Sequence, residues 1–233
     1  MLTSRLGLAS VACTTLLLST SCEPEWHGGG IPHRETRSVA LDRSEFVRAN
    51  LRMGAGELRI RGGASELMEG EFSYDRMRMH PEVHYNSGLL TVEEPSGFHS
   101  GRGPNRWDLA FNNEKPLDLE INFGAGSGRL NLASLSLRRV DIHMGVGHLE
   151  IDLRGEPKED YSLSLNGGIG DATVYLPEHA GVVADVKGGI GGIDARGLSG
   201  WRGRYVNAAY GHAKTTVRLD IRGGIGAIHL IGD

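Results

Sequence analysis

The sequence has little proline, few aromatic residues and no sustained helical pattern. Prolines number 8, and aromatic residues make up 6% of the 233 residues. Apolar residues at helical spacing do not persist over any long segment, so we expect little α-helix. Lysine and arginine are scattered and the formal net charge is −4, which gives no sign of a nucleic-acid-binding surface. Glycine is the residue in excess, at 35 copies, without a collagen period.

The N-terminus has the features of an export signal. Arg5 precedes a short apolar run that ends at Leu18, and small residues lead to Cys22. A run this short does not span a bilayer as a permanent helix. We predict a signal peptide over residues 1–21 and lipidation of Cys22, although Ser19 stands where a lipobox carries leucine. The alternative is an ordinary signal peptide followed by a stray cysteine.

Lipidation would explain why a single cysteine is left. If Cys13 is removed with the leader, Cys22 has no partner for a disulfide within the chain. Residues 22–34 contain two prolines and three consecutive glycines, which is typical of a flexible tether. The sequence thus predicts an exported, membrane-anchored lipoprotein that faces the periplasm or the cell surface.

A Gly-x-Gly motif recurs along the body of the chain. Counted from the second glycine, the separations are 70, 21, 23, 21 and 35 residues, and three near-equal intervals in a row indicate a structural repeat. We assign these residues as turn glycines, because sharp corners need positive φ or close backbone approach. They are Gly54, Gly56, Gly124, Gly126, Gly145, Gly147, Gly168, Gly170, Gly189, Gly191, Gly224 and Gly226.

Residues on both sides of the glycines alternate between apolar and polar. After the third motif, Leu149, Ile151 and Leu153 are interleaved with polar residues. Period two indicates strands with one buried face. Two or three such strands in about 21 residues predict an all-β fold, a glycine-rich parallel β-helix or β-solenoid.

The chain divides into regions by regularity. We predict a small, less regular β region at residues 35–95 with the first Gly-x-Gly coil, a loop at 96–106, and the regular solenoid at 107–233. The 35-residue interval exceeds the usual coil by about 14 residues. We expect residues 198–214 to leave the coil and cover part of the final one.

The repeats resemble those of a known bacterial family. Residues 53–64, 115–126 and 166–170, together with the Gly-Gly-Ile-Gly near the C-terminus, are similar to the toast-rack family. The resemblance implies an exported β-solenoid domain. It extends distantly to the C-terminal domains of cell-wall stress-response regulators of the LiaF type, which act through protein contacts at the envelope. It implies no catalytic residues.

The sequence offers one weak cluster of polar side chains. Alignment on the second glycine predicts an outward-facing patch on three coils. Its members are His148, Glu150, Asp171 and Asp194. Such groups are able to bind a cation or transfer protons, but a solvated strand face is the more ordinary interpretation. We therefore expect no catalytic residues, no metal and no cofactor.

These observations predict a non-enzymatic envelope lipoprotein that acts as a scaffold, a sensor or an adhesin-like contact module. The alternative is a β-helix that binds or degrades cell-wall polysaccharide. Its sequence signal is the presence of Trp201, Tyr205 and Tyr210 in the long interval. The expected partners are the membrane, through the lipid anchor, and an envelope protein or a second copy, through the unpaired edge of the last coil. No nucleic acid is expected.

Overall fold

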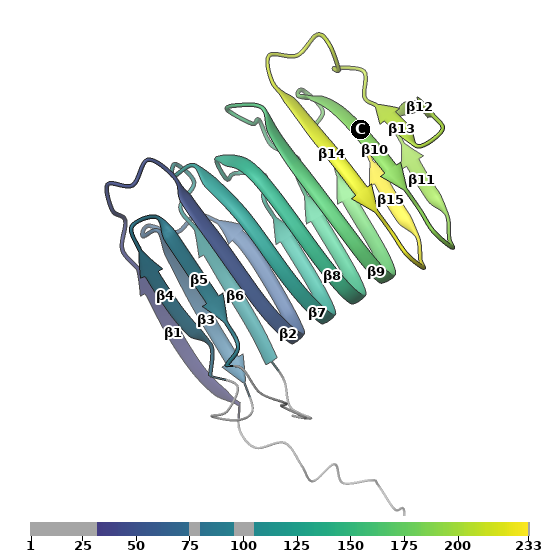
Figure 1. Ribbon diagram of the computed structural model, residues 1–233. Helices are drawn as coiled ribbons and strands as arrows, with labels where there is room; N and C mark the ends of the chain where they lie inside the picture. The colour runs from purple at the N-terminus through teal and green to yellow at the C-terminus, as the bar shows by residue number, and fades with distance from the viewer. Residues whose placement is uncertain (1–31, 75–79, 96–104, 233) are drawn as a thin grey trace, which may run out of the picture.

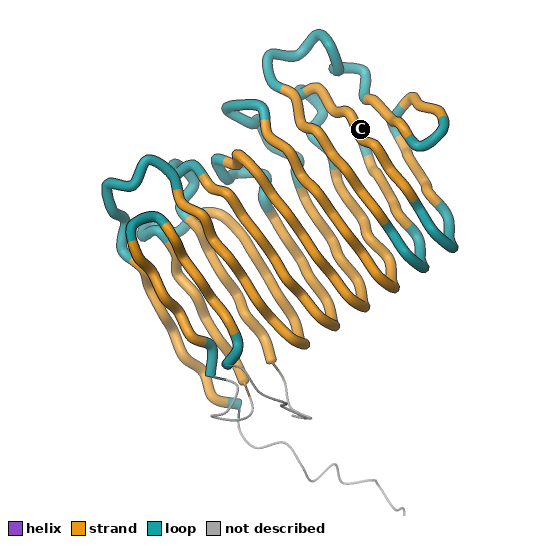
Figure 2. The backbone as a smooth tube through the Cα atoms, viewed as in Figure 1, coloured by secondary structure: helices purple, strands orange, loops and turns teal. Residues whose placement is uncertain are grey.

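The structure, a computed structural model, describes residues 32–74, 80–95 and 105–232. All the regular elements of these ranges are β-strands, which join in one 15-stranded sheet (Figures 1 and 2). The predicted all-β solenoid is therefore confirmed. No helix within these ranges is long and apolar enough to cross a membrane. The predicted signal peptide, Cys22, most of the tether and most of the loop at 96–106 lie outside the described residues.

Four long strands form the middle of the solenoid and pair in parallel. Each continues through its Gly-x-Gly bend, so one strand supplies both faces of a flattened coil (Figure 2). We call the side before the bends the first face and the side after them the second face. The bends make one edge of the solenoid, the bend edge, and the loops make the other. The strands are β2 (Val47–Gly62), β7 (Leu117–Asn131), β8 (Leu137–Asp152) and β9 (Tyr161–Tyr175).

The glycine motifs set the register between coils. Gly126 pairs with Gly56 on one side and with Gly147 on the other. Because strand residues alternate in direction, this register stacks the same inward column in every coil. The column through Ile121 and Ile142 is an example, and both residues are 1% exposed. Leu149 lies between Gly128 and Ala172 and is 5% exposed, as the alternation predicts.

The N-terminal end is less regular, as predicted, and the structure shows that it is partly antiparallel. A hairpin of β4 (Glu82–Asn86) and β5 (Leu89–Glu93) continues the first face from β2. On the second face, β6 (Asn105–Phe111), β3 (Met68–Tyr74) and β1 (His33–Val39) extend the sheet outward in that order. Trp107 and Phe72 pack edge to face at 5.6 Å and close the core at this end. The predicted boundary at residue 107 falls inside β6.

At the C-terminal end, the order of coils in space differs from their order in sequence. The last coil of the chain, β14 (Thr216–Arg222) and β15 (Ile228–Ile231), lies between β9 and the preceding coil, β10 (Gly181–Lys187) and β11 (Ile193–Arg196). Our premise that the chain's last coil is the open edge is therefore wrong. The terminal coil is the one made by β10 and β11 (Figure 1).

The 35-residue interval explains this inversion. After β11 the chain forms a hairpin of β12 (Ser199–Trp201) and β13 (Arg204–Val206), and β13 pairs antiparallel with the outer edge of β10. The outer edge is thus occupied, and β14 pairs in parallel with the inner edge instead. Leu198 and Tyr205 pack against the core. The predicted excursion beside a terminal coil is found, but that coil is the fifth in sequence.

Candidate contact surfaces

The bends have a geometry that requires glycine at two positions. The second glycine of all six motifs has φ between 133° and 147°, a region that side chains disfavour. A Cβ at Gly126 would overlap the carbonyl oxygen of Gly56 in the adjacent coil. A Cβ at the first glycine, Gly124, would overlap the carbonyl of Gly54 in the same way. Adjacent coils therefore meet backbone to backbone at the bend edge.

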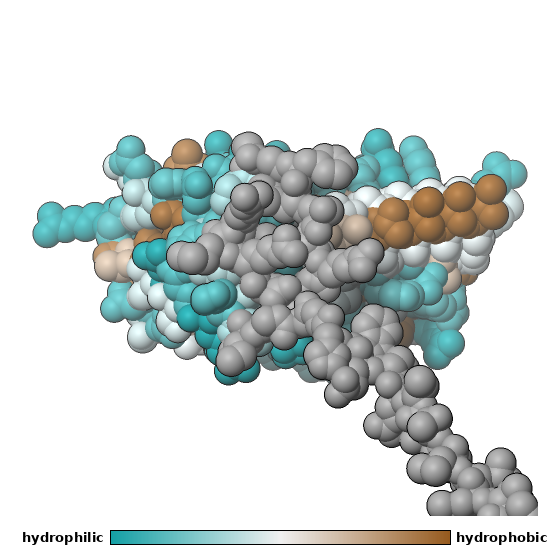
Figure 3. Space-filling view, turned by 90° about the horizontal axis from the view of Figure 1, so that it is seen from below, coloured by the Kyte–Doolittle hydropathy of each residue, from teal (hydrophilic) through white to brown (hydrophobic). Residues whose placement is uncertain are grey.

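The middle residue of each motif is the one that can carry a side chain, and it points outward. These residues stack from coil to coil, in the spatial order Ala55, Ala125, Val146, Ile169, Ile225 and Ile190. The last four are large hydrophobic residues that are 48%, 52%, 49% and 73% exposed. We call these four the apolar ridge. It is the row of brown side chains in Figure 3, which looks onto the bend edge.

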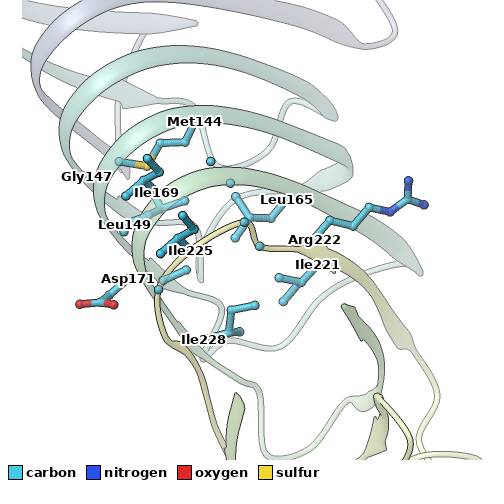
Figure 4. A pocket seen from close by; sticks show the side chains of 17 residues that line it. Met144, Gly147, Leu149, Leu165, Ile169, Asp171, Ile221, Arg222, Ile225 and Ile228 are labelled. Atoms are coloured by element: carbon cyan, nitrogen blue, oxygen red, sulfur yellow. The ribbon is translucent and has the colours of Figure 1, made fainter. Parts of the chain in front are cut away.

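A small cavity lies inside the coil, behind the ridge. Its volume is about 30 Å³, and Leu149, Leu165 and Ile221 line it together with bend glycines (Figure 4). Gly167 and Ala172, also in its lining, leave this space because both are small. The cavity has room for about one water molecule. It is too small for a lipid chain or a sugar, so a ligand at this edge would have to bind outside.

The predicted polar patch is divided by the inverted order of the coils. His148 and Asp171 are neighbours on the second face, with Nδ1 and Oδ2 3.7 Å apart. Asp194 is on the terminal coil, beyond the interposed β15, so it does not join them. The single patch over three coils is therefore wrong.

Each patch member already has a partner nearby. Oδ1 of Asp171 accepts a hydrogen bond from the backbone nitrogen of Ala227 at 2.9 Å, which ties the last coil to β9. Glu150 faces Arg129 at 3.5 Å. Asp194 contacts His229 at 3.5 Å and Arg196 at 2.9 Å. In the described ranges, no group of three or more His, Cys, Asp or Glu residues is arranged to hold a metal ion.

Charged residues elsewhere on the second face are paired in the same way. Burial alone would raise the pKa of Glu57, but hydrogen bonds from Arg59 and Arg106, both 2.7 Å long, hold it below its ordinary value. The carboxylate therefore stays ionised over the whole neutral range. Its neighbours fix it as a structural anion rather than as a proton donor.

A polar depression of about 520 Å³ lies on the first face. Aspartate, glutamate and arginine dominate its lining, and it contains no aromatic side chain. The lining residues are Arg48, Asp118, Leu119, Glu120, Arg138, Arg139, Asp141, Glu159, Asp160 and Ser162. The depression is therefore a charged, solvated part of the strand face.

Comparisons with known proteins place the chain in a family. The sequence model described as the N-terminal domain of toast_rack, DUF2154, matches residues 29–175, which is more than half of the chain. The chain belongs to the toast-rack family. The resemblance inferred from the repeats is thereby confirmed. No curated protein matches the sequence.

A solved structure shares the architecture of this toast-rack chain. A candidate cell adhesion protein from Clostridium sporogenes ATCC 15579 is 29% identical, with a TM-score of 0.83 over 87% of this chain and 100% of that protein. A candidate adhesin from Bacteroides fragilis NCTC 9343 is 11% identical, with a TM-score of 0.36 over 86% of this chain and 97% of its own. The second likeness is too low to support a conclusion.

The apolar ridge of the toast-rack chain is the surface that our sequence analysis missed. Its signal is present in the motifs, since the middle residue changes from alanine to valine and then to isoleucine along the repeats. The prediction that the motifs are turns includes no direction for their middle residue. A β-branched residue between two glycines that contact the backbone of the adjacent coils points its side chain to solvent, and this property identifies the ridge.

Proposed function

We propose that this chain is a non-enzymatic lipoprotein of the cell envelope, held to a membrane through Cys22, whose solenoid serves as a contact module. Its role is that of a scaffold, a sensor or an adhesin-like surface. The distant resemblance to stress-response regulators makes the envelope stress response the process in which to look for it first.

The observation that carries this proposal is the continuous ladder of the middle coils. The strands β7 and β8 keep one register on both sides of the bend, from Leu117 with Leu137 to Asn131 with Asp152. The register is irregular near Leu117, and the first glycines of the two bends are not in the pairing. Such a ladder presents flat columns of polar side chains on both faces, held by a backbone that is hydrogen-bonded along most of its length. A stiff body with flat faces suits contact with another surface. The likeness to the Clostridium sporogenes protein, a candidate cell adhesion protein, supports the same role.

The polysaccharide alternative has less support from the geometry. A carbohydrate-binding strip needs several exposed aromatic rings in one plane. Trp201 is 77% exposed and Tyr210 38%, but Tyr205 packs against the core instead of joining them. The isolated Trp201 ring is contacted by Arg202, whose guanidinium lies 4.7 Å from its centroid.

Fractionation of cells tests the anchor. We expect Cys22→Ser to move the protein from the detergent-extracted membrane fraction to the soluble exported fraction, because the residue that would receive the lipid is gone. Cys13→Ser is the matched control, and it should leave the protein in the membrane fraction. Wild-type protein that is already soluble would show that the lipoprotein proposal is wrong.

Crosslinking in intact cells tests the contact role. A photoreactive residue in place of Ser164 samples the first face, and one in place of Thr173 samples the second; both positions are half-buried on outward columns. We expect a discrete protein adduct from at least one face. If neither position gives an adduct and the purified protein instead cleaves cell-wall polysaccharide, the non-enzymatic proposal fails.

A further inference from the structure

The apolar ridge lacks an explanation in the folding of the chain. Its side chains point away from the core, and about half or more of the surface of each is exposed. Isoleucine at such a corner is only partly buried, and a contiguous apolar row on a surface marks an interaction site. The row follows the axis of the solenoid at the strand spacing of about 4.8 Å.

The folded chain begins at the same edge as the ridge. His33, at the start of β1, pairs with Tyr74, and Tyr74 pairs with Asn105. The side-chain nitrogen of Asn105 donates a hydrogen bond of 2.8 Å to the carbonyl oxygen of Ala55, the middle residue of the first bend. Figure 1 shows β1 starting at this lower edge of the sheet, where the bends lie. The first strand therefore connects to the preceding chain at the bend edge.

The length of that preceding chain limits how far the bend edge can be from a membrane. Cys22 precedes His33 by eleven residues, which span at most roughly 36 Å when fully extended. If the lipid is on Cys22, the bend edge is the part of the body that the anchor holds nearest to the bilayer. An apolar row on this edge lies where a membrane can receive it.

The charges beside the ridge suit an anionic lipid surface. The outward column on the first face, three residues before the middle residue of each of the six motifs, contains no acidic residue. From the first coil to the terminal one it reads Arg52, Asn122, His143, Asn166, Arg222 and Lys187. Lys187 and Arg222 precede the most C-terminal ridge positions, Ile190 and Ile225; Arg222 also pairs with Asp220 at 2.9 Å. On the other side of the ridge the one acidic residue directly after a bend of these four coils is Asp171, which is tied to Ala227. Basic residues beside an interfacial apolar group add attraction to anionic headgroups.

We infer that the apolar ridge docks on the surface of an anionic lipid bilayer, with the bend edge facing the membrane and the loop edge facing away. The orientation rests on the anchor proposed at Cys22, whereas the lipid contact itself does not. A protein interface of standard size needs a broad apolar centre. This row is one residue wide and bordered by glycines, a shape that lipid accommodates more readily than a folded partner does.

Docking and anchoring would work together. The lipid on Cys22 would hold the protein at the membrane without fixing its orientation, because the predicted tether of residues 22–34 lies between them. The ridge would fix the direction in which the solenoid stands. The two polar faces would then be upright on the membrane and accessible from the side, which is the arrangement that a contact module needs.

Thiol protection tests the orientation in the anchored protein. We would place a cysteine at Ile169 on the ridge, and at Glu156, an exposed residue of the loop edge, as the control. The rate of reaction with a membrane-impermeant maleimide is compared between the membrane-anchored form and the soluble exported form that carries Cys22→Ser. We expect Ile169→Cys to react about tenfold more slowly on the membrane, since contact with lipid excludes the reagent, and Glu156→Cys to react equally in both forms.

Three results would overturn the inference. Ile169→Cys that reacts at the same rate in both forms shows that the ridge does not touch the membrane. Protection of Ile169→Cys in the soluble form as well shows that a second copy covers the ridge. Equal protection of Glu156→Cys shows that the shielding is not confined to the bend edge. Labelling of wild-type protein at Cys22 would instead show that Cys22 carries no lipid, so that the proposed anchor is wrong. The flotation experiment below then tests the contact between the ridge and lipid by itself.

Flotation with lipid vesicles tests the contact without the anchor. Exported Cys22→Ser protein is mixed with vesicles of phosphatidylglycerol and phosphatidylethanolamine, or of phosphatidylcholine alone. We expect binding to the anionic vesicles, reduced about tenfold by Ile169→Ser with Ile225→Ser because two apolar contacts are lost. Leu89→Ser is the matched control, because Leu89 is 45% exposed at the far end of its strand. Absence of binding, or binding that the double variant does not change, contradicts the inference.

Discussion

The first three coils and the last three, counted along the solenoid, fill their bends in opposite ways. In the first three, the inward position two residues before the middle of the motif holds Met53, Phe123 and Met144, which are 3%, 3% and 8% exposed. In the last three it holds glycine: Gly167, Gly223 and Gly188. The outward middle residue changes in the reverse direction, from alanine and valine to isoleucine. Apolar bulk has moved from the inside of the bend to the outside.

This difference shows that the outward isoleucines do not fill the space that the inward Met or Phe side chain occupies in the first three coils. At the last two coils the space is filled from another column, since a Cβ at Gly223 would lie 2.9 Å from Cδ1 of Ile228 and one at Gly188 would lie 3.5 Å from Cδ1 of Ile193. Among the last three coils, the coil of β9 has no such side chain, because the residue in register with Ile228 is Ala172. The 30 Å³ cavity lies at this coil. The interior of the last two coils is thus filled by Ile228 and Ile193 and not by the ridge.

The largest expected effect comes from a change at the boundary between the two kinds of coil. Leu149 is 5% exposed and stacks between coils, so Leu149→Asp buries a carboxylate without a partner. This burial reduces the free energy of unfolding by roughly several kcal/mol. Against a typical stability of about 5–15 kcal/mol, we expect loss of the folded state. Circular dichroism and chemical denaturation measure it.

The adjacent residue is the control for that change. Glu150 is on the outward face of the same strand, so Glu150→Lys should alter the free energy of unfolding by no more than about 0.5 kcal/mol. If the lysine variant unfolds and the aspartate variant does not, the register of the whole stack is displaced by one residue.

A second change asks whether the first three coils depend on their inward bulk. Phe123 is 3% exposed, and Phe123→Ala should reduce stability by about 3–5 kcal/mol, the usual cost of deleting a buried ring. Urea denaturation gives the value. A loss below about 1 kcal/mol would mean that these bends collapse around the space left by the ring. The inward side chains of the first three coils would then contribute little to the free energy of unfolding.

A third change concerns the hairpin that covers the terminal coil. Tyr205 packs against the core from β13, and Trp201 lies exposed on β12. Replacing both with serine should loosen the hairpin and uncover the outer edge of β10, so we expect self-association or aggregation, because unpaired strand edges recruit other strands. Light scattering reports the mass. A variant that keeps its original mass and thermal stability would show that the hairpin is not a cap.

The sequence predicted what depends on local periodicity. Strand alternation and the glycine motifs gave the coils, their register and the position of Leu149, because period two and the demand for positive φ act within a few residues. The order of the coils in space could not be predicted from this local periodicity. Whether β14 pairs with the inner or the outer edge of β10 depends on where the β12–β13 hairpin lies, and both arrangements satisfy the same alternation.

The candidate site followed the same division. The columns that contain His148 and Asp171 were predicted correctly from the motif spacing, whereas Asp194 was assigned to the wrong neighbours because the inverted coil separates them. The ridge was open to prediction from the motifs alone. It required only the inference that the middle residue of a corner with close backbone contact on both sides must point to solvent.

The smallest effect is the most specific test of the contrast, and it is a gain in stability. Gly167 lines the cavity, its φ is not in the left-handed region, and a Cβ there would come no nearer than 3.9 Å, to the carbonyl oxygen of Arg222. Gly167→Ala therefore fills empty space and reduces the freedom of the unfolded chain, which should add about 0.4–1 kcal/mol. Thermal denaturation, with a rise in Tm, measures the gain.

Gly147→Ala is the matched comparison, because it adds the same methyl group at a bend of the neighbouring coil. There φ is 141° and the Cβ would overlap the carbonyl oxygen of Gly126, so we expect a loss of at least about 1–3 kcal/mol from backbone strain alone. The two alanines should therefore differ in sign although both replace glycine beside the same cavity. If both variants destabilise the protein, the bend needs the cavity in order to adjust. Glycine at the inward position of the last three coils would then be required by the backbone, and would not simply reflect the loss of the inward Met or Phe side chain.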